Sequence, residues 1–475
     1  MTSPFPGKGG QGGEMLIIKT MFNDFHHALV VDNELCYGCT HCMMACPTAA
    51  IRIDNGKAVI IDERCIDCGE CMKACPVDAI FVEQDDFIKI FEYEYRIAIV
   101  PAVFLGQFSK KISVKEIVDA IKETGFTHVF LAEESAEVIN EVMLNEYGSD
   151  RERPLISPFC PAVVRLIQVK FPGMVENIIP VKTPVDSTAM YVKKYMQDNG
   201  LPEERTGMFY VTPCAAKIAA LKSIPEDEIV IHGVINMDML YNKVYHIFKT
   251  RKGKNEVEKG LFTGISPKVL KWSLTGGEAD NMKGRCLAID EIHNVTKFLE
   301  RVEDGDIINV DFLELRACDH GCAGGVLMTE NRFLTVERIR TKADRIKEDL
   351  PEQSIEKYHD HLKVNAGINE IEPRSIFKLD ENMEEAYRKM QRIRHLMCFL
   401  PAIDCGACGA PNCQSLAEDV VKGNAHLSNC IFIQRSMEKN RKLSNEHALR
   451  LIEKVWGKDR LDKNCNKKGA ENETD

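Results

Sequence analysis

The sequence predicts a multidomain α/β protein built from a small α+β module, a larger α/β domain and a small helical domain. Three observations lead to this fold class. A cysteine run occurs twice near the start, strand-like and helix-like segments alternate from 96 to 371, and a last cysteine group lies among helical segments. The expected boundaries are a flexible tail at 1–22, the duplicated module at 23–92, the α/β domain at 93–375, the helical domain at 376–434, and a terminal helix with a disordered tail at 435–475.

Composition excludes several classes of protein. The chain has 475 residues, of which 44% are hydrophobic, and charges interrupt every apolar run, so no membrane span is expected. The first fifteen residues lack the apolar core of a secretion signal. A net charge of −11 argues against nucleic acid as a partner, because proteins that bind it carry basic surfaces.

The 19 cysteines indicate the chemistry. All but Cys286, Cys398 and Cys465 fall into three spaced groups. Disulfide-rich scaffolds are short and secreted, whereas this chain is long and shows no signal segment. We therefore expect a reducing, cytoplasmic location and thiolates that hold metal. The three remaining cysteines receive no role, since free buried cysteines are common.

The first group consists of two similar runs. Residues 36–46 read CYGCTHCMMAC and residues 65–75 read CIDCGECMKAC, and a proline follows each. Strand-like segments flank both runs, so each half reads as a strand–loop–helix–strand unit. The pattern Cys-x2-Cys-x2-Cys-x3-Cys-Pro resembles ferredoxins that hold two 4Fe–4S clusters, over about residues 25–90.

The spacing also assigns the ligands. Three cysteines in a tight loop reach three corners of one cluster, and the fourth points away to the other cluster. The expected sets are Cys36, Cys39, Cys42 and Cys75 for the first cluster, and Cys46, Cys65, Cys68 and Cys71 for the second. A pair of zinc sites is the alternative, but zinc ribbons use separated Cys-x2-Cys pairs with a long gap between them.

The central segment shows a βαβ rhythm, which predicts parallel strands with ligands at the strand ends. Four cysteines fall where strands or helices end: Cys160, Cys214, Cys318 and Cys322. The first two each lie beside a proline before a helix, where backbone N–H groups stabilise a thiolate or its cluster.

These three segments, ISPFCPAVVRL, VTPCAAKIAAL and ELRACDHGCAGG, resemble the signature loops of FeFe-hydrogenases, in the same order. The resemblance implies that Cys160, Cys214, Cys318 and Cys322 bind a 4Fe–4S cluster. It further implies that Cys322 bridges to a di-iron subcluster with CO and cyanide ligands.

Other segments extend the resemblance. IVPAV, with Pro101 and Ala102, resembles the segment whose backbone lies against a cyanide, and Lys217 matches the lysine that binds a cyanide nitrogen. LTGGEA, with Thr275, Gly276 and Gly277, resembles another family segment near the cofactor. FLAEESAE resembles the segment that bears proton-path carboxylates, here Glu134 and Glu137, although these could also form a solvated helix face.

Five positions depart from the pattern, and one of them is a serine of the proton path, which corresponds to Ile179 or Pro180 here. The cysteine that passes protons to the di-iron site is replaced by Phe159, which cannot carry a proton. Two methionines are replaced by Thr212 and Arg316, and an arginine of the proton path is replaced by Glu141. A positioned proton donor contributes roughly 10²–10⁴-fold in rate, so we expect hydrogen turnover at least about a hundredfold below that of a complete site. Arg316 could pair with a carboxylate such as Glu314. His320 could donate a hydrogen bond, lie exposed, or carry protons in place of the missing cysteine.

The last cysteine group has the pattern Cys405-x2-Cys408-x4-Cys413-x16-Cys430. Gly406, Gly409 and Pro411 make a tight loop around the ligands. The group resembles a small 4Fe–4S domain of anaerobic electron-transfer proteins, with zinc as the alternative.

Taken together, the sequence predicts a low-activity FeFe-hydrogenase-type oxidoreductase with an electron relay through 4Fe–4S clusters. Its expected partner is a redox protein such as a ferredoxin or another oxidoreductase. Two alternatives stay open. The chain could be a hydrogen or redox sensor that acts through a signalling partner, which the missing proton relay favours. It could also be an electron-transfer protein without the di-iron unit.

Overall fold

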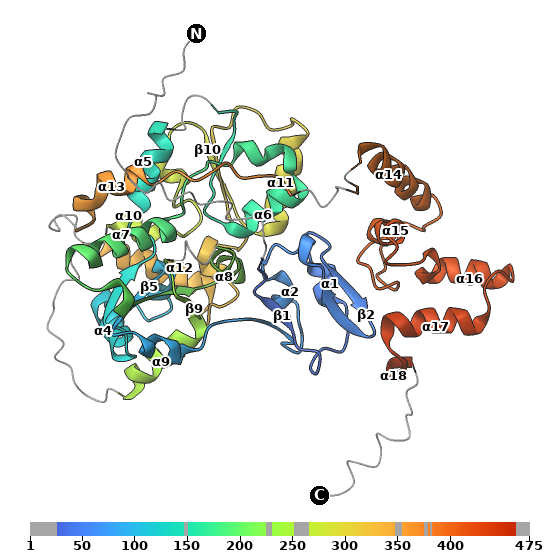
Figure 1. The fold of residues 1–475 in the computed structure, drawn as a ribbon, viewed down its shortest axis with the longest axis horizontal. Coiled ribbons are helices and arrows are strands. Elements are labelled where there is room, and N and C mark those ends of the chain that lie inside the picture. Colours follow the sequence, from blue (N-terminus) through green and yellow to red (C-terminus); the bar gives the residue numbers. More distant parts are fainter. Residues whose placement is uncertain are drawn as a thin grey trace, which may run out of the picture.

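The computed structural model describes residues 26–146, 151–224, 230–250, 266–346, 354–374, 379–380 and 382–461. Figure 1 shows three regions, and the N-terminal module lies between the large α/β region and the C-terminal helices, although it comes first in the chain. No helix within the described residues is both long and apolar enough to cross a membrane. The predicted tail at 1–22 and Cys465 lie outside the described residues.

The N-terminal module consists of two similar halves. The first half contains β1 (Leu29–Val31), α1 (His41–Ala45) and β2 (Ile51–Asp54), and the second contains β3 (Lys57–Ile60), α2 (Glu70–Lys73) and β4 (Ile80–Val82). Strands β1 and β4 pair antiparallel, as do β2 and β3, so each pair joins a strand of the first half to a strand of the second half. Asn55 and Gly56 both have positive φ, which closes the β2–β3 hairpin in a tight turn.

A four-stranded parallel sheet forms the first half of the α/β region. Its order is β6-β5-β8-β9, from β5 (Tyr95–Val100), β6 (His128–Leu131), β8 (Thr206–Thr212) and β9 (Gly233–Asn236). Every residue of β8 is buried, as expected for a central parallel strand. The helices of this half are α3 (Ala102–Gly106), α4 (Val114–Glu123), α8 (Ala215–Lys222), α9 (Met237–Thr250), α10 (Pro267–Lys271) and α12 (Arg332–Asp344).

A second parallel sheet has the order β10-β11-β7, from β7 (Leu155–Ile156), β10 (Cys286–Ile289) and β11 (Phe312–Leu315). Its helices include α6 (Pro161–Lys170), whose side chains are buried from Pro161 to Val169, and α11 (Ile292–Glu303). Nearby lie α5 (Ala136–Glu146), α7 (Pro184–Asp198) and α13 (His359–Val364). The carboxyl ends of β7, β8 and β11 lead directly into the three central cysteine segments.

The C-terminal region is helical, with α14 (Met383–Met397), α15 (Cys413–Val421), α16 (Ile431–Lys439), α17 (Asn445–Trp456) and α18 (Lys458–Leu461). Asn382 caps α14 by accepting hydrogen bonds from the backbone N–H groups of Glu384 and Glu385. Apolar side chains of α14, among them Ile393 and Leu396, pack on Leu416 of α15 around the thiols.

The observed elements confirm the predicted fold class. The duplicated module has the expected strand–loop–helix–strand halves, the central region has parallel strands, and the last cysteine group lies among helices. The exact domain boundaries stay a prediction.

Candidate functional site

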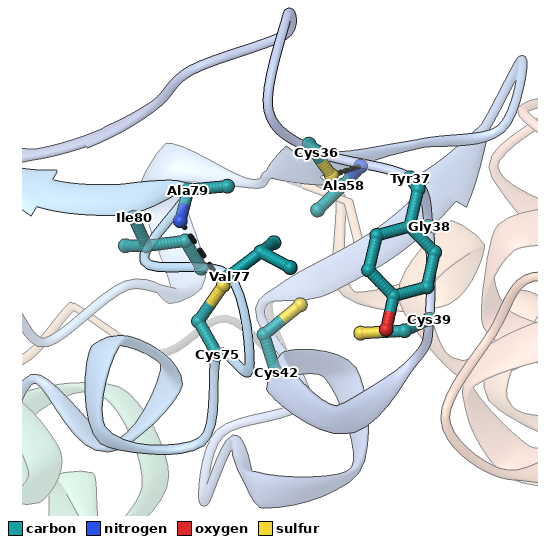
Figure 2. Close-up of a pocket in the computed structure, with 10 residues that line it drawn as sticks. All are labelled: Cys36, Tyr37, Gly38, Cys39, Cys42, Ala58, Cys75, Val77, Ala79 and Ile80. Atoms are coloured by element: carbon teal, nitrogen blue, oxygen red, sulfur yellow. Dashed lines mark hydrogen bonds between the residues drawn. The ribbon is translucent and has the colours of Figure 1, made fainter. Parts of the chain in front are cut away.

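The N-terminal module brings its eight thiols together in two groups. Figure 2 shows the first pocket, which Cys36, Cys39, Cys42 and Cys75 line together. Backbone N–H groups of Ala58 and Ala79 point at the sulfurs of Cys36 and Cys75, at 3.4 and 3.2 Å. Such N–H groups stabilise the negative charge of a thiolate or its cluster.

The second pocket is lined by Cys46, Cys65, Cys68 and Cys71. The Ala50 N–H lies 3.2 Å from the Cys46 sulfur, as the Ala79 N–H lies from Cys75, so the duplication extends to the contacts of the thiols. Each half thus sends its fourth cysteine to the pocket of the other half, which is the grouping that the spacing predicts. That the two groups bind clusters stays a prediction.

Burial makes these thiols costly to ionise. It raises the pKa of Cys42 to about 12 and raises the pKa of Cys65 and Cys68 well above the usual range. A bound metal would reverse this preference, because a coordinating thiol is deprotonated outright. The described pockets therefore suit metal-bound sulfur better than free thiolates.

The central cysteines lie at the N-termini of helices or in the loop after β11. Cys160 precedes α6, and Cys214 precedes α8. Cys318 lies just before a short 3-10 turn, Gly321–Gly324, which contains Cys322. Two backbone hydrogen bonds join the third segment to its neighbours, one to the residue before the Leu274–Ala279 segment and one to the second cysteine segment. Cys322 N–H donates to Ser273 O at 3.0 Å, and Leu327 N–H donates to Pro213 O at 3.0 Å.

The four central thiols lie close enough together to affect one another's pKa. Burial raises the pKa of Cys318, and the neighbouring thiols raise it further. These thiols belong to Cys214, Cys160 and Cys322. Burial likewise raises the pKa of Cys214 to about 12, with Cys322 and Cys160 adding to the effect. The structure therefore brings together the four residues that the three signature segments single out.

Lys217 lies inside this site. Its side chain is buried, and its ammonium nitrogen lies 3.8 Å from the sulfur of Cys322. Burial alone would lower the pKa of Lys217, but the nearby Cys322 thiol, with the Tyr210 phenol and Cys214, raises it above the usual value. The helix α8 thus presents a permanent cation to the sulfur that the resemblance assigns as the bridging ligand.

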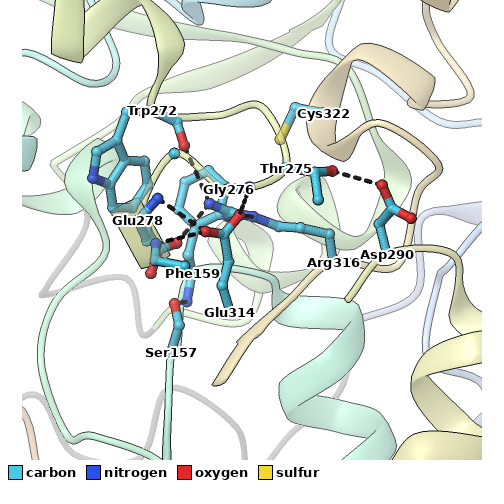
Figure 3. A network of polar contacts seen from close by, with 12 residues as sticks. Ser157, Phe159, Trp272, Thr275, Gly276, Glu278, Asp290, Glu314, Arg316 and Cys322 are labelled. Atoms are coloured by element: carbon cyan, nitrogen blue, oxygen red, sulfur yellow. Dashed lines mark hydrogen bonds and ion pairs between the residues drawn. The ribbon is translucent and has the colours of Figure 1, made fainter. Parts of the chain in front are cut away.

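A buried ionic network surrounds Arg316 (Figure 3). Its guanidinium contacts Glu278 at 2.6 Å and Glu314 at 3.1 Å, and it donates to the carbonyl oxygen of Trp272 at 3.2 Å. Burial opposes the charge, but Glu278 and then Glu314 raise the pKa of Arg316 above its usual range. The pairing of Arg316 with Glu314 was predicted from the sequence, and the structure confirms it.

The segment Thr275–Gly277 is positioned by the same network. Glu314 accepts hydrogen bonds from the backbone N–H groups of Gly276, Glu278 and Ala279 at 2.9–3.0 Å. The Thr275 hydroxyl donates to Asp290 at 2.7 Å. At Gly277 a Cβ would lie 2.3 Å from the Trp272 carbonyl oxygen, so the close approach requires glycine. The predicted cofactor-binding role of this segment stays a prediction.

Sequence reasoning missed Glu133. This carboxylate is 1% exposed, and it accepts a hydrogen bond from the Ala102 N–H at 2.9 Å, beside Pro101. Burial raises its pKa, which Lys217 counteracts. The sequence signal that could have identified Glu133 was its position just after β6 and directly before Glu134, because β6 pairs with β5 and their ends lie side by side.

Glu134 and Glu137 lie in less central positions. Glu134 accepts a hydrogen bond from the Leu131 N–H at 2.8 Å, and burial raises its pKa to about 7. Glu137 is exposed in the first turn of α5 and accepts a hydrogen bond from the Ser266 hydroxyl at 2.6 Å. Their role in proton transfer stays a prediction.

Two other residues from the sequence analysis have defined contacts. Glu141 accepts from His359 at 2.8 Å and from Lys363 at 3.0 Å, which ties α5 to α13. His320 has a positive φ, and its half-buried ring lies edge-on to Phe333 at 4.8 Å between centroids.

The C-terminal thiols also lie close together. Burial raises the pKa of Cys408 to about 11, and the thiols of Cys430 and Cys405 add to the effect. Gly406 and Gly409 have positive φ, as expected for a tight loop around ligands. Cys413 begins α15, and its N–H donates to the Asp404 carboxylate at 2.7 Å.

The donor sets fit the implied groups to different extents. Each set of four convergent thiols fits a 4Fe–4S cluster. Around Cys322, the ammonium of Lys217 and the Nη1 of Arg316, which has no hydrogen-bond partner within the described residues, suit an anionic group. Glu133 already accepts the hydrogen bond of the Ala102 N–H, in the segment whose backbone, by the resemblance, would lie against a cyanide ligand.

Three segments match known family models. Residues 95–229 match the model described as iron only hydrogenase large subunit, C-terminal domain. Residues 28–76 match the 4Fe-4S dicluster domain, and residues 400–432 match a putative Fe-S cluster domain.

Among curated proteins, the NADP-reducing hydrogenase subunit HndD of Solidesulfovibrio fructosivorans is 28% identical over 109 residues. The match covers 21% of this chain and 19% of that subunit, so it spans about a fifth of the relative. Similar solved structures include the [FeFe]-hydrogenase HydA(deltaEFG), with TM-score 0.45 and 15% identity. HydA1 from Chlamydomonas reinhardtii gives TM-score 0.44 and 16% identity. Both comparisons cover 59% of this chain and 94% of the other. The chain is therefore a hydrogenase-like iron–sulfur protein, in which a segment similar to iron only hydrogenase large subunits lies between a segment similar to 4Fe–4S dicluster domains and one similar to a putative Fe–S cluster domain.

Proposed function

We propose that the chain is an iron–sulfur oxidoreductase with slow or sensory hydrogen chemistry at an FeFe-hydrogenase-type site. The observation that carries the proposal is the position of Lys217, whose buried ammonium lies 3.8 Å from the sulfur of Cys322, one of the four central thiols. A buried cation at the sulfur expected to bridge two metal groups is well placed for a negatively charged cofactor.

In this proposal, Cys160, Cys214, Cys318 and Cys322 hold a 4Fe–4S cluster, and Cys322 also holds a di-iron subcluster with CO and cyanide ligands. When bound, that group would supply reversible two-electron, two-proton hydrogen chemistry. Lys217 would bind one of its anionic ligands, and the buried Arg316 would add positive charge. The N-terminal and C-terminal clusters would carry electrons to and from a redox partner.

Slow turnover follows from Phe159. Its ring is 3% exposed and packs against Trp272, with 4.6 Å between ring centroids, so an apolar wall stands where a proton donor is expected. Because a positioned donor contributes roughly 10²–10⁴-fold, the loss of this donor would suit a sensor that turns over little substrate. A signalling partner would then read the state of the site.

A second candidate is an electron-transfer protein without the di-iron unit. The hydrogen bond from Ala102 to Glu133 favours it, because a carboxylate already satisfies the backbone donor that a cyanide would need. The same four thiols would then hold only a 4Fe–4S cluster.

An infrared spectrum of the protein, purified anaerobically from its native host, separates these candidates. Bands of bound CO and cyanide are expected, together with hydrogen oxidation at least about a hundredfold slower than that of a complete site. Absence of these bands, with iron accounting only for 4Fe–4S clusters, would favour the second candidate. Turnover as fast as a complete hydrogenase would contradict the slow or sensory function.

A further inference from the structure

The C-terminal cysteine loop lies against the first thiol group of the N-terminal module. A Cβ at Gly406, next to Cys405, would lie 3.0 Å from the Cε of Met43 and 3.6 Å from the Sδ of Met44. Both methionines belong to α1, directly after Cys42. The backbone of Ile53 donates a hydrogen bond to Gly409 O at 2.9 Å, so the two loops are joined directly.

The last helices fix this contact. In the β2–β3 hairpin, Asn55 N–H donates to Lys454 O and Gly56 N–H donates to Val455 O, both at 2.8 Å. The indole of Trp456 donates to Ala407 O at 3.0 Å, within the cysteine loop. From α18, Arg460 donates to the carbonyl oxygens of Tyr37 and Gly38, at 2.6 and 2.7 Å, in the segment between Cys36 and Cys39.

Two largely buried ion pairs hold the same interface. Arg52 pairs with Asp419 at 2.6 Å, and Arg64 pairs with Glu418 at 2.5 Å. Removing one partner of such a pair leaves an uncompensated charge, so the pairs favour one arrangement of the two domains. The C-terminal domain is therefore docked on the N-terminal module in a defined position.

The second thiol group faces the hydrogenase-like domain instead. Cys68 packs against the same apolar cluster as Cys160 and Cys214. A Cβ at Gly69 would lie 2.4 Å from the side chain of Val326, just after the Cys318–Cys322 loop. The buried ion pair of Asp67 with Arg165, at 2.6 Å, joins this face to α6.

From these contacts we propose that the C-terminal cluster is the electron port of the protein. Electrons enter or leave there, one at a time, and pass through the first and then the second N-terminal cluster to the buried central site. Each step oxidises one cluster and reduces the next by one electron, and the external partner is a one-electron carrier protein. The order rests on the four-cluster relay of the proposed function but does not require the di-iron unit.

The surface of the port indicates which carrier it fits. Cys405 is exposed, and the nearby Phe399 and Ile403 are each 56% exposed. Arg392, Arg394 and His395 of α14 are also exposed, and the His395 ring lies edge-on to Phe399 at 5.0 Å between centroids. The chain as a whole carries a net charge of −11, whereas the last turns of α14 carry exposed cations beside exposed apolar side chains, which fits a carrier with an acidic docking surface.

The docking face is tested by charge reversal. We would mix the oxidised, anaerobic holoprotein with a reduced, acidic 2[4Fe–4S] ferredoxin. Reduction of the clusters of the holoprotein would be followed by stopped-flow absorbance, with the absorbance gain of the oxidised ferredoxin subtracted. The variant R392E/R394E is expected to accept electrons at least about tenfold more slowly at low salt, since opposite charges steer association. The matched control R340E alters an exposed arginine of α12 in the hydrogenase-like domain and should react like the wild type. Equal rates for R392E/R394E and the wild type would overturn the docking face.

The order of the relay is tested at Cys405. In C405A and in C405S, reduction of the N-terminal clusters by the ferredoxin should slow at least about tenfold, since the port is damaged, while photoreduced deazaflavin should still reduce them at the wild-type rate. Electron paramagnetic resonance of the N-terminal clusters reports whether they stay intact. Intact clusters that the ferredoxin still reduces at the wild-type rate would overturn the port. Missing infrared bands of CO and cyanide would overturn only the hydrogen chemistry of the proposed function.

Discussion

The ring of Phe159 lies against the ammonium group of Lys217, with 4.1 Å between the nitrogen and the ring centroid. The guanidinium carbon of Arg316 lies 4.0 Å from the same centroid. Cations are attracted to an aromatic face by its quadrupole, and the attraction grows when the cation is desolvated. The ring thus stands where the resemblance predicts a proton donor, and it stabilises two buried cations that would otherwise repel each other.

Restoring the donor should accelerate hydrogen chemistry. In F159C, a thiol takes the position of the ring, and we expect hydrogen evolution from a reduced dye to rise by about a hundredfold in protein that shows CO and cyanide bands. The control F159A opens the same space without a titratable group. An equal gain in F159A would show that access to water, rather than the thiol, limits the wild-type site.

Removing the cation of Arg316 should destabilise the fold. In R316M, which restores the residue type of the resemblance, Glu278 loses its partner at 2.6 Å, and burial, which already raises the pKa of Glu278 to about 7, then favours an uncharged carboxyl with an unmet hydrogen-bonding need. Breaking a buried ion pair in this way costs about 3–5 kcal/mol in the free energy of unfolding. Anaerobic urea unfolding of the holoprotein, followed by circular dichroism, measures it. The double variant R316M/E278Q should recover part of the loss, and a single variant as stable as the wild type would contradict the network.

Cysteine replacements test the crossed grouping of the N-terminal thiols. C46A and C65A remove ligands of the same predicted cluster, so the double variant should lose only about four irons, like each single variant. C46A combined with C36A should lose about eight, because these residues belong to different pockets. Iron analysis and electron paramagnetic resonance measure both. The reverse result would show that each run of four cysteines holds its own cluster.

The ion pair of His359 with Glu141 should give a pH-dependent stability. The hydrogen bond to Glu141 raises the pKa of His359 above 6.5, so the folded state binds this proton more tightly than the unfolded state. The stabilisation is then complete below pH 6.5 and disappears as the pH rises through the folded-state pKa. In H359Q, we expect the melting temperature to fall below that of the wild type at pH 5.5 and to match it near pH 8.5. A difference independent of pH would contradict the charged pair.

Much of the grouping of the thiols could be predicted because its signals are local. The spacing within a short duplicated unit predicts that Cys46 and Cys75 each line the pocket of the other half. The helix starts at Cys160 and Cys214 follow from the neighbouring proline and apolar residues. These features depend on a few residues whose backbone geometry is constrained by the motif itself. The fold class, the grouping of strands and the Arg316–Glu314 contact were accessible for the same reason.

The role of Glu133 was not accessible in this way. Its contact with Ala102 depends on the parallel pairing of β5 and β6, which sets Val100 opposite Leu131 and brings the two strand ends together. The docking of the C-terminal domain on the N-terminal module could not be predicted from the sequence either. Arg52 could have paired with any of the 72 acidic residues, and the choice of Asp419 is made only by the tertiary fold.

The hydrogen bonds between the β2–β3 hairpin and α17 join two segments that lie almost 400 residues apart in the sequence, near the two ends of the described chain. A protease that cuts the backbone once between residues 57 and 453 would leave two pieces that still hold each other. Such a nick would appear on a denaturing gel but not as a change of size in solution. Shortened versions that end before 383 would leave Met43, Ile53 and Arg52 without their cover, so they should aggregate more readily than the whole chain.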